Sequence, residues 1–125
     1  MSDSLYAEAG VNIDKGNQAV DKIKSMVKKM GVSEIGKFSG FFPLKGELKN
    51  PTLVSSADGV GTKLKIAFLM DKHDTIGKDL VNHCVDDIIV YGSKPLFFLD
   101  YIATGNLEPE TVSQIVSGML NGCLE

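Results

Sequence analysis

A glycine-containing segment near the middle of the chain carries residue types that could bind a phosphate group. A short apolar stretch around Leu53 passes into serine and alanine, and then into a run made of Asp58, Gly59, Val60, Gly61, Thr62 and Lys63. A strand that opens through a glycine-rich turn into a helix presents backbone N–H groups to phosphate oxygens. At the mouth of this turn, the Asp58 carboxylate could hold Mg²⁺ against the phosphates, and Lys63 could add a positive charge.

The spacing within this turn differs from two common phosphate-binding motifs. A Walker A loop ends in Gly-Lys-[Ser/Thr], whereas here Lys63 follows Thr62. In a dinucleotide-binding fingerprint that began at Gly59, the third glycine position would be occupied by Leu64. A tight strand-to-helix turn without a ligand is therefore the alternative interpretation, since glycine also serves wherever a turn needs a positive φ.

A second acidic residue stands out because of the helix predicted around it. Residues 75–91 show helical periodicity with a broad apolar arc, and Asp87 falls inside that arc near the angular position of Leu80. A buried, unpaired carboxylate costs on the order of several kcal/mol. We therefore expect Asp87 to have a partner. A Mg²⁺ ion shared with Asp58 would satisfy it, and a structural hydrogen bond or a salt bridge with Lys63 is the alternative.

Neither histidine is assigned to this site, and a substrate contact of His73 is kept as an alternative. His83 precedes Asp87 by one helical turn, but no third ligand for a transition metal is apparent, so we expect a helix-surface residue. His73 falls in a polar loop, where a solvated or capping side chain is expected.

The bulk composition indicates one globular domain in a reducing compartment. The chain has 125 residues and a formal net charge of −3, which argues against a general nucleic-acid surface. Neither a signal peptide nor an apolar run of membrane-spanning length is visible. Cys84 and Cys123 lack metal-type spacing and are expected to be reduced thiols. These features predict a cytoplasmic protein without nucleic-acid or membrane partners.

The elements predicted around these residues combine helices with short strands. Helices are expected over Asp14–Met30, with Asp14 as its cap, and over Lys63–Met70, Thr75–Tyr91 and Glu108–Glu125. Strands are expected over Thr52–Ala57 and Leu96–Ala103, and residues 36–46 suit a short strand or a flap. The second strand is nearly all apolar, so it should be central in a sheet or buried in an interface. The predicted class is α+β, with two α/β layers in which a mixed β-sheet packs on helices.

Several blocks of the chain closely resemble the phosphoribosylformylglycinamidine cyclo-ligase family, also called aminoimidazole ribonucleotide synthetase. The blocks are Asp58–Leu64, His73–Gly77, Asp79–Val81 and Pro95–Gly105, together with the N-terminal stretch Tyr6–Asn17. The resemblance implies an ATP- and Mg²⁺-dependent enzyme of de novo purine biosynthesis. It would activate the formyl oxygen of formylglycinamidine ribonucleotide as a phosphate ester. The amidine nitrogen would then close the imidazole ring, with release of ADP and phosphate.

The resemblance also implies an architecture and a set of binding residues. The family enzyme has two α/β domains and is a homodimer whose N-terminal domains pair their sheets across the two-fold axis. Residues 1–125 would be a single, incomplete N-terminal domain for ATP binding and dimerisation, with the C-terminal domain absent. The whole run from Asp58 to Lys63 matches the nucleotide-phosphate segment, Asp58 and Asp87 match the metal positions, and Lys24 matches an ATP-site lysine more loosely.

The chain departs from the family pattern in three places. Asp86 replaces the asparagine that usually precedes the second metal-binding acid, and residues 36–42 contain fewer glycines than the family's flap. The chain also ends at Glu125, before a Gly-Gly-Glu-Thr-Ala-Glu type motif, so we expect it to be a fragment that is inactive alone. Two alternatives stay open. One is another ATP-using enzyme of the same superfamily, of the selenophosphate synthetase or thiamine-monophosphate kinase type, and the other is a non-catalytic dimerisation module.

Overall fold

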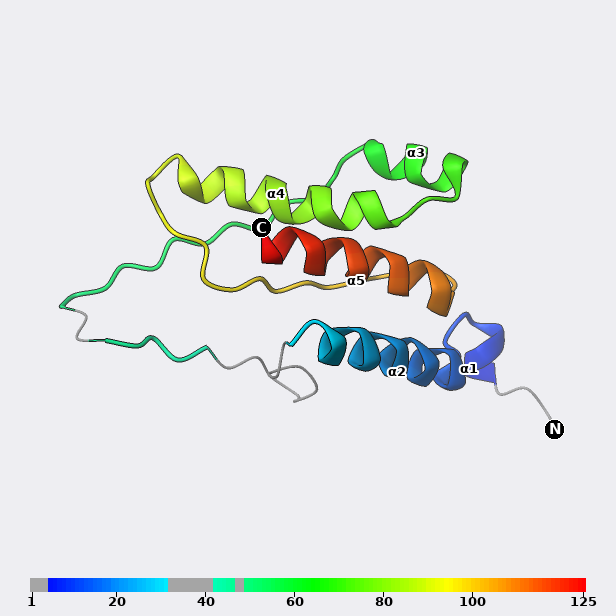
Figure 1. The fold of residues 1–125 in the computed structure, drawn as a ribbon. Coiled ribbons are helices and arrows are strands. Elements are labelled where there is room, and N and C mark those ends of the chain that lie inside the picture. Colours follow the sequence, from blue (N-terminus) through cyan, green and yellow to red (C-terminus); the bar gives the residue numbers. More distant parts are fainter. Residues whose placement is uncertain (1–4, 32–41, 47–48) are drawn as a thin grey trace.

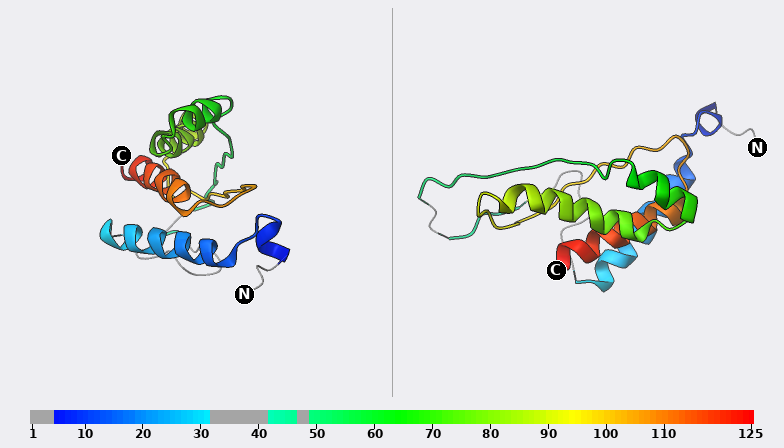
Figure 2. Two further views of the ribbon diagram at one scale, coloured as in Figure 1. Left: turned by 90° about the vertical axis from the view of Figure 1, so that its right-hand side faces the viewer. Right: turned by 90° about the horizontal axis from the view of Figure 1, so that it is seen from above.

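Helices alone provide the regular structure of the described part of the chain. The computed structural model describes residues 5–31, 42–46 and 49–125. The helices are α1 (Leu5–Glu8), α2 (Ile13–Lys29), α3 (Lys63–Met70), α4 (Asp74–Ile89) and α5 (Pro109–Leu124). Helix α5 lies between α2 and α4, and α3 packs beside α4, so the helices form layers (Figures 1 and 2).

The four longer helices confirm the helix predictions to within two residues at either end. Helix α3 has the predicted bounds, and α2, α4 and α5 begin or end one or two residues from the predicted positions. The cap of α2 was predicted at Asp14, but the Asn12 side chain caps the helix by accepting a hydrogen bond from the Lys15 backbone N–H at 2.9 Å. Local periodicity and capping chemistry are sufficient to explain these elements because helix hydrogen bonds join residues close in sequence.

The predicted mixed β-sheet is wrong for the residues that the structure describes. Segments 52–57 and 96–103 are extended, but neither takes part in backbone–backbone hydrogen bonds. Leu99 is 72% exposed and Tyr101 is 91% exposed, so the second segment is not the covered central strand that we expected. Apolar and β-branched residues favour an extended backbone, but a strand requires a neighbour that completes the ladder of hydrogen bonds. The α+β class is therefore replaced by a helical arrangement.

Residues 36–46 were predicted as a short strand or a flap. Positions 36–41 lie outside the described residues, and positions 42–46 form no regular element.

The closest packing in the described structure joins α4 to α5 through glycines. A Cβ atom added to Gly118 would lie 1.7 Å from the carbonyl oxygen of Asp74, and one added to Gly77 would lie 1.9 Å from the carbonyl oxygen of Ile115. The two helix backbones therefore touch where these glycines meet. The buried side chains that surround the contact include Ile76 and Val81 of α4 and Val112 and Met119 of α5.

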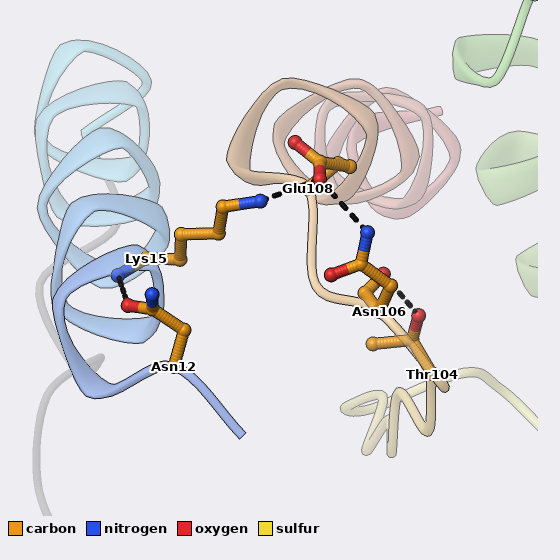
Figure 3. Close-up of polar contacts among 5 residues, drawn as sticks. All are labelled: Asn12, Lys15, Thr104, Asn106 and Glu108. Atoms are coloured by element: carbon orange, nitrogen blue, oxygen red, sulfur yellow. Dashed lines mark hydrogen bonds and ion pairs between the residues drawn. The ribbon is translucent and has the colours of Figure 1, made fainter. Parts of the chain in front are cut away.

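Polar contacts at one end of α2 attach this helix to the start of α5. Lys15 Nζ lies 2.6 Å from Glu108 Oε1, which also accepts a hydrogen bond from Asn106 Nδ2 at 3.1 Å (Figure 3). The Thr104 hydroxyl donates to the Asn106 carbonyl oxygen at 2.7 Å, which orders the turn before α5. The contacts of Lys15 and Asn106 lower the pKa of the Glu108 carboxyl, with Lys15 as the largest cause.

Replacing Lys15 with methionine is expected to raise the pKa of Glu108 toward its ordinary value. The folded-state pKa is depressed, so this contact contributes to stability above the unfolded-state pKa and is lost as the pH falls through the folded-state pKa. Carbon-detected NMR titration of the Glu108 carboxyl checks the expectation. Lys28→Met, at the other end of α2, is the matched control. An unchanged pKa of Glu108 in Lys15→Met would contradict the contact.

Candidate site for a phosphate-bearing ligand

The glycine-containing loop leads directly into α3. Gly61 has a φ of 59°, in the left-handed region where glycine is favoured, whereas Gly59 does not have a positive φ. Helix α3 begins at Lys63, and no side chain caps it. Within the described part of the chain, the backbone N–H groups of residues 60–63 have no hydrogen-bond partner. These N–H groups are therefore free to donate to an anion at the start of the helix.

The Lys63 side chain turns toward α4. Its Nζ forms an ion pair with Asp79 and lies 2.8 Å from His83 Nε2. The other ring nitrogen of His83, Nδ1, lies 3.9 Å from Asp58 Oδ2. We call these four residues, Asp58, Lys63, Asp79 and His83, the Lys63 cluster. Their side chains are between 36% and 51% exposed, so a small ligand can reach them.

Asp58 is oriented at both of its carboxylate oxygens. Oδ1 accepts a hydrogen bond from the Gly59 backbone N–H at 2.6 Å, and Oδ2 faces His83. A carboxylate held in this way keeps free lone pairs on both oxygens. Asp58 is therefore suited to hold a hard cation such as Mg²⁺ beside the free N–H groups of the loop.

Asp87 is exposed, and the prediction that it lies in a buried apolar arc is wrong. The face of α4 that packs against α5 is narrower than the apolar arc of the sequence, and its buried residues are Ile76, Gly77 and Val81. The alternative interpretation, a structural hydrogen bond, is present, because the Ser56 hydroxyl donates to Asp87 Oδ2 at 2.5 Å. Together these two residues line a hollow of about 510 Å³, whose other walls are Val54, Ser55, Asp86, Val90 and Tyr91.

The segment before the loop contacts α4 at two points, and these contacts place Asp58 beside the helix that carries Asp87. Asp58 faces His83, and Ser56 contacts Asp87. His83 and Asp87 are four residues apart, a rise of about 6 Å along the helix. No contact joins Asp58 to Asp87, and among the described residues no group of three His, Cys, Asp or Glu side chains could hold a metal ion. Joint coordination of one Mg²⁺ by the two aspartates stays a prediction.

Lys24 does not lie beside the other predicted residues. It is an exposed residue of α2, and α5 separates α2 from α3 and α4 (Figure 2). Its assignment to an ATP site therefore depends on the sequence resemblance alone.

Comparison with known proteins identifies the family. Residues 44–125 match the family model described as AIR synthase related protein, N-terminal domain. The chain belongs to this family.

Individual members of the AIR synthase family are similar over nearly all of the chain. It is 57% identical over 125 residues to a protein of Trichlorobacter lovleyi named phosphoribosylformylglycinamidine cyclo-ligase, covering 96% of this chain and 36% of that relative. A Thermoanaerobacter protein of the same name is 57% identical over 122 residues, covering 94% and 36%. One from Syntrophotalea carbinolica is 54% identical, covering 100% and 38%. The chain thus spans somewhat more than a third of the length of these curated relatives.

Sequence reasoning missed two residues of the site in this member of the AIR synthase family. Asp79 was not among the predicted ligand-binding residues, and His83 was expected to be a helix-surface residue. Their spacing of four residues puts them on one side of a helix, one turn apart. That spacing was visible in the sequence. Only the fold shows that the Lys63 side chain reaches both of them.

A second hollow, of about 520 Å³, adjoins Lys63 between α3 and α4. Lys72 and Lys78 line it together with Lys63, and its apolar wall includes Ile66 and Met70. Asp79 also lines this hollow and pairs with Lys63, and Lys78 pairs with Glu125, so the lysines here are largely matched by carboxylates.

His73 is buried rather than solvated, with 3% of its surface exposed. It occupies the position before α4, where its backbone N–H donates to Gln114 Oε1 at 3.2 Å and its ring packs edge-on against Phe68. We therefore assign His73 to the packing between α3, α4 and α5, not to ligand binding.

None of the helices in the described part of the chain combines the length and the apolar character needed to cross a membrane. Both cysteines are free thiols, as predicted.

Proposed function

We propose that this chain is the ATP-binding, N-terminal part of an enzyme that cyclises formylglycinamidine ribonucleotide to aminoimidazole ribonucleotide. The observation that carries the proposal is the similarity, over nearly the whole chain, to proteins named phosphoribosylformylglycinamidine cyclo-ligase. The reaction is the ATP-dependent ring closure of de novo purine biosynthesis, in which the formyl oxygen is activated by phosphorylation. The enzyme is expected to be a cytoplasmic homodimer with a small-molecule substrate.

The loop and the start of α3 are the proposed phosphate site. The free N–H groups of residues 60–63 would donate to phosphate oxygens, and the Lys63 ammonium would add positive charge beside them. The N–H groups at the start of α3 and the positive end of the helix dipole both favour an anion there.

Asp58 and Asp87 are the proposed Mg²⁺ ligands. Both carboxylates are exposed: Asp58 lies at the start of the loop against His83 of α4, and Asp87 lies on α4 against Ser56. When bound, Mg²⁺ neutralises phosphate charge. The two aspartates would hold the ion next to the phosphate-binding loop. Lys24 is proposed as a further ATP contact, and the family resemblance is the only support for this assignment. No residue of this chain is assigned as catalytic.

We expect the isolated chain to bind ATP without completing the reaction. The chain spans only 36–38% of its relatives, so other substrate contacts would come from the rest of the protein. We therefore propose that residues 1–125 form one N-terminal unit for ATP binding and dimerisation.

Calorimetric titration of the 125-residue chain with ATP tests the proposed site. We expect saturable binding in the presence of Mg²⁺ and at least a tenfold loss of affinity when EDTA removes the metal ion, a difference of about 1.4 kcal/mol. Circular dichroism of the same sample confirms that its helices are formed. The absence of Mg²⁺-dependent ATP binding by the folded chain would refute the site and favour a dimerisation module.

A further inference from the structure

The contacts of His83 indicate which of its two ring nitrogens carries the proton. Lys63 Nζ lies 2.8 Å from His83 Nε2. A lysine ammonium has three N–H donors and no acceptor, so a hydrogen bond between these two atoms requires a lone pair on Nε2. A ring proton on Nε2 would instead bring two donors together beside a positive charge. His83 Nε2 is therefore the unprotonated nitrogen of the ring.

A neutral imidazole that is unprotonated at Nε2 carries its proton on Nδ1. The Nδ1 atom lies 3.9 Å from Asp58 Oδ2. At this separation the N–H is too far for a direct hydrogen bond, but it attracts the carboxylate electrostatically. The donor is therefore on the nitrogen that faces the proposed metal-binding acid.

Asp79 completes the arrangement from the other side. Its carboxylate pairs with the Lys63 ammonium, which holds that ammonium next to His83 on the adjacent turn of α4. Contacts thus run from Asp79 through Lys63 and His83 to Asp58. Replacing a residue that orients a metal ligand typically lowers metal affinity by about 10- to 100-fold.

We propose that His83 is a positioning residue for Asp58, held by Lys63 as the neutral, Nδ1-protonated tautomer. Its role in Mg²⁺–ATP binding depends on the proposed function, but the tautomer itself does not. The position of the His83 side chain thereby links the lysine of the phosphate site to the acid of the metal site.

Long-range ¹H–¹⁵N correlation spectra of the ligand-free chain test the tautomer directly. The chain has two histidines, so His73 serves as an internal reference. In mildly alkaline buffer we expect His83 to show a protonated Nδ1 and a pyridine-type Nε2. In Lys63→Met we expect the His83 population to shift toward the Nε2-protonated tautomer, with His73 unchanged. A His83 ring that is mainly Nε2-protonated in the unsubstituted chain would overturn the inference.

Two substitutions of His83 separate positioning from general packing. The side-chain amide of asparagine places its N–H₂ near the position of Nδ1, whereas glutamine reaches toward the position of Nε2 and lacks a donor facing Asp58. We expect Mg²⁺-dependent ATP affinity to fall about tenfold in His83→Gln and to stay within about twofold in His83→Asn. Equal losses in the two variants would overturn the positioning role. If the unsubstituted chain binds no Mg²⁺–ATP, the proposed function fails, and the NMR result still decides the tautomer.

Discussion

Gly118→Ala is expected to lower the free energy of unfolding by about 3 kcal/mol, near the upper end of the usual cost of overpacking. The added Cβ would lie 1.7 Å from the Asp74 carbonyl oxygen, 2.8 Å from the Asp74 carbonyl carbon and 2.9 Å from the Lys78 backbone nitrogen. All three are backbone atoms of α4, and they cannot rotate aside as a side chain can. The helices α4 and α5 must separate, and the buried side chains around the crossing lose their contacts. Urea unfolding followed by circular dichroism measures the change.

Two further glycines provide controls for this experiment. Gly16, in α2, has no heavy atom within 4 Å of an added Cβ, so Gly16→Ala is expected to raise stability by about 0.5–1 kcal/mol. Gly122→Ala would place its Cβ 3.0 Å from Val81 Cβ, and an intermediate loss is expected. If Gly118→Ala does not fold, Gly122→Ala still tests the crossing. Unfolding midpoints equal to that of the unsubstituted chain in both variants would show that the two helices do not pack as described.

A chimera that joins this chain to the remainder of the Trichlorobacter lovleyi relative is expected to form aminoimidazole ribonucleotide. The two sequences are 57% identical across the exchanged part, so most contacts to the rest of the protein should be retained. Asp58→Asn in the chimera is expected to reduce kcat/KM at least about a hundredfold, since the change removes the charge of a proposed Mg²⁺ ligand. Product formation is measured after derivatisation of the aminoimidazole.

The control for the chimera replaces an aspartate outside the proposed site. Asp21 is exposed on α2 and has no polar contact within the described residues, so Asp21→Asn should leave kcat/KM within about twofold. An Asp58→Asn chimera with the activity of the Asp21→Asn chimera would remove Asp58 from the metal site. A folded chimera that binds Mg²⁺–ATP but forms no product would instead favour another ATP-using reaction of the superfamily.

The Lys63 cluster shows why local patterns predicted the loop but not all of its surroundings. Gly61 needs its left-handed backbone for the turn, and the helix begins at Lys63, as the residue order indicated. The destination of the Lys63 side chain depends on the angle at which α3 meets α4. That angle is set by packing between residues distant in sequence, so the contacts with Asp79 and His83 could not be derived from spacing.

Two of the wrong structural predictions share one cause. A strand at 96–103 and a buried Asp87 both assumed a neighbour that would cover an apolar surface. In the described structure the extended segment exchanges no backbone hydrogen bonds, and only one side of α4 is covered by α5. Burial depends on what lies opposite a surface, and hydrophobic periodicity reports only that a surface is apolar.

The sequence by itself determined the four longer helices, the glycine turn before α3 and membership of the AIR synthase family. These depend on residue order: helix hydrogen bonds, caps and left-handed glycines act over a few neighbouring residues, and family motifs are read directly from the chain. Only the tertiary structure decided that Gly77 and Gly118 bring two helix backbones into contact, and that His83 lies between Lys63 and Asp58. Such contacts form between segments far apart in the chain, so their geometry follows from how the helices pack.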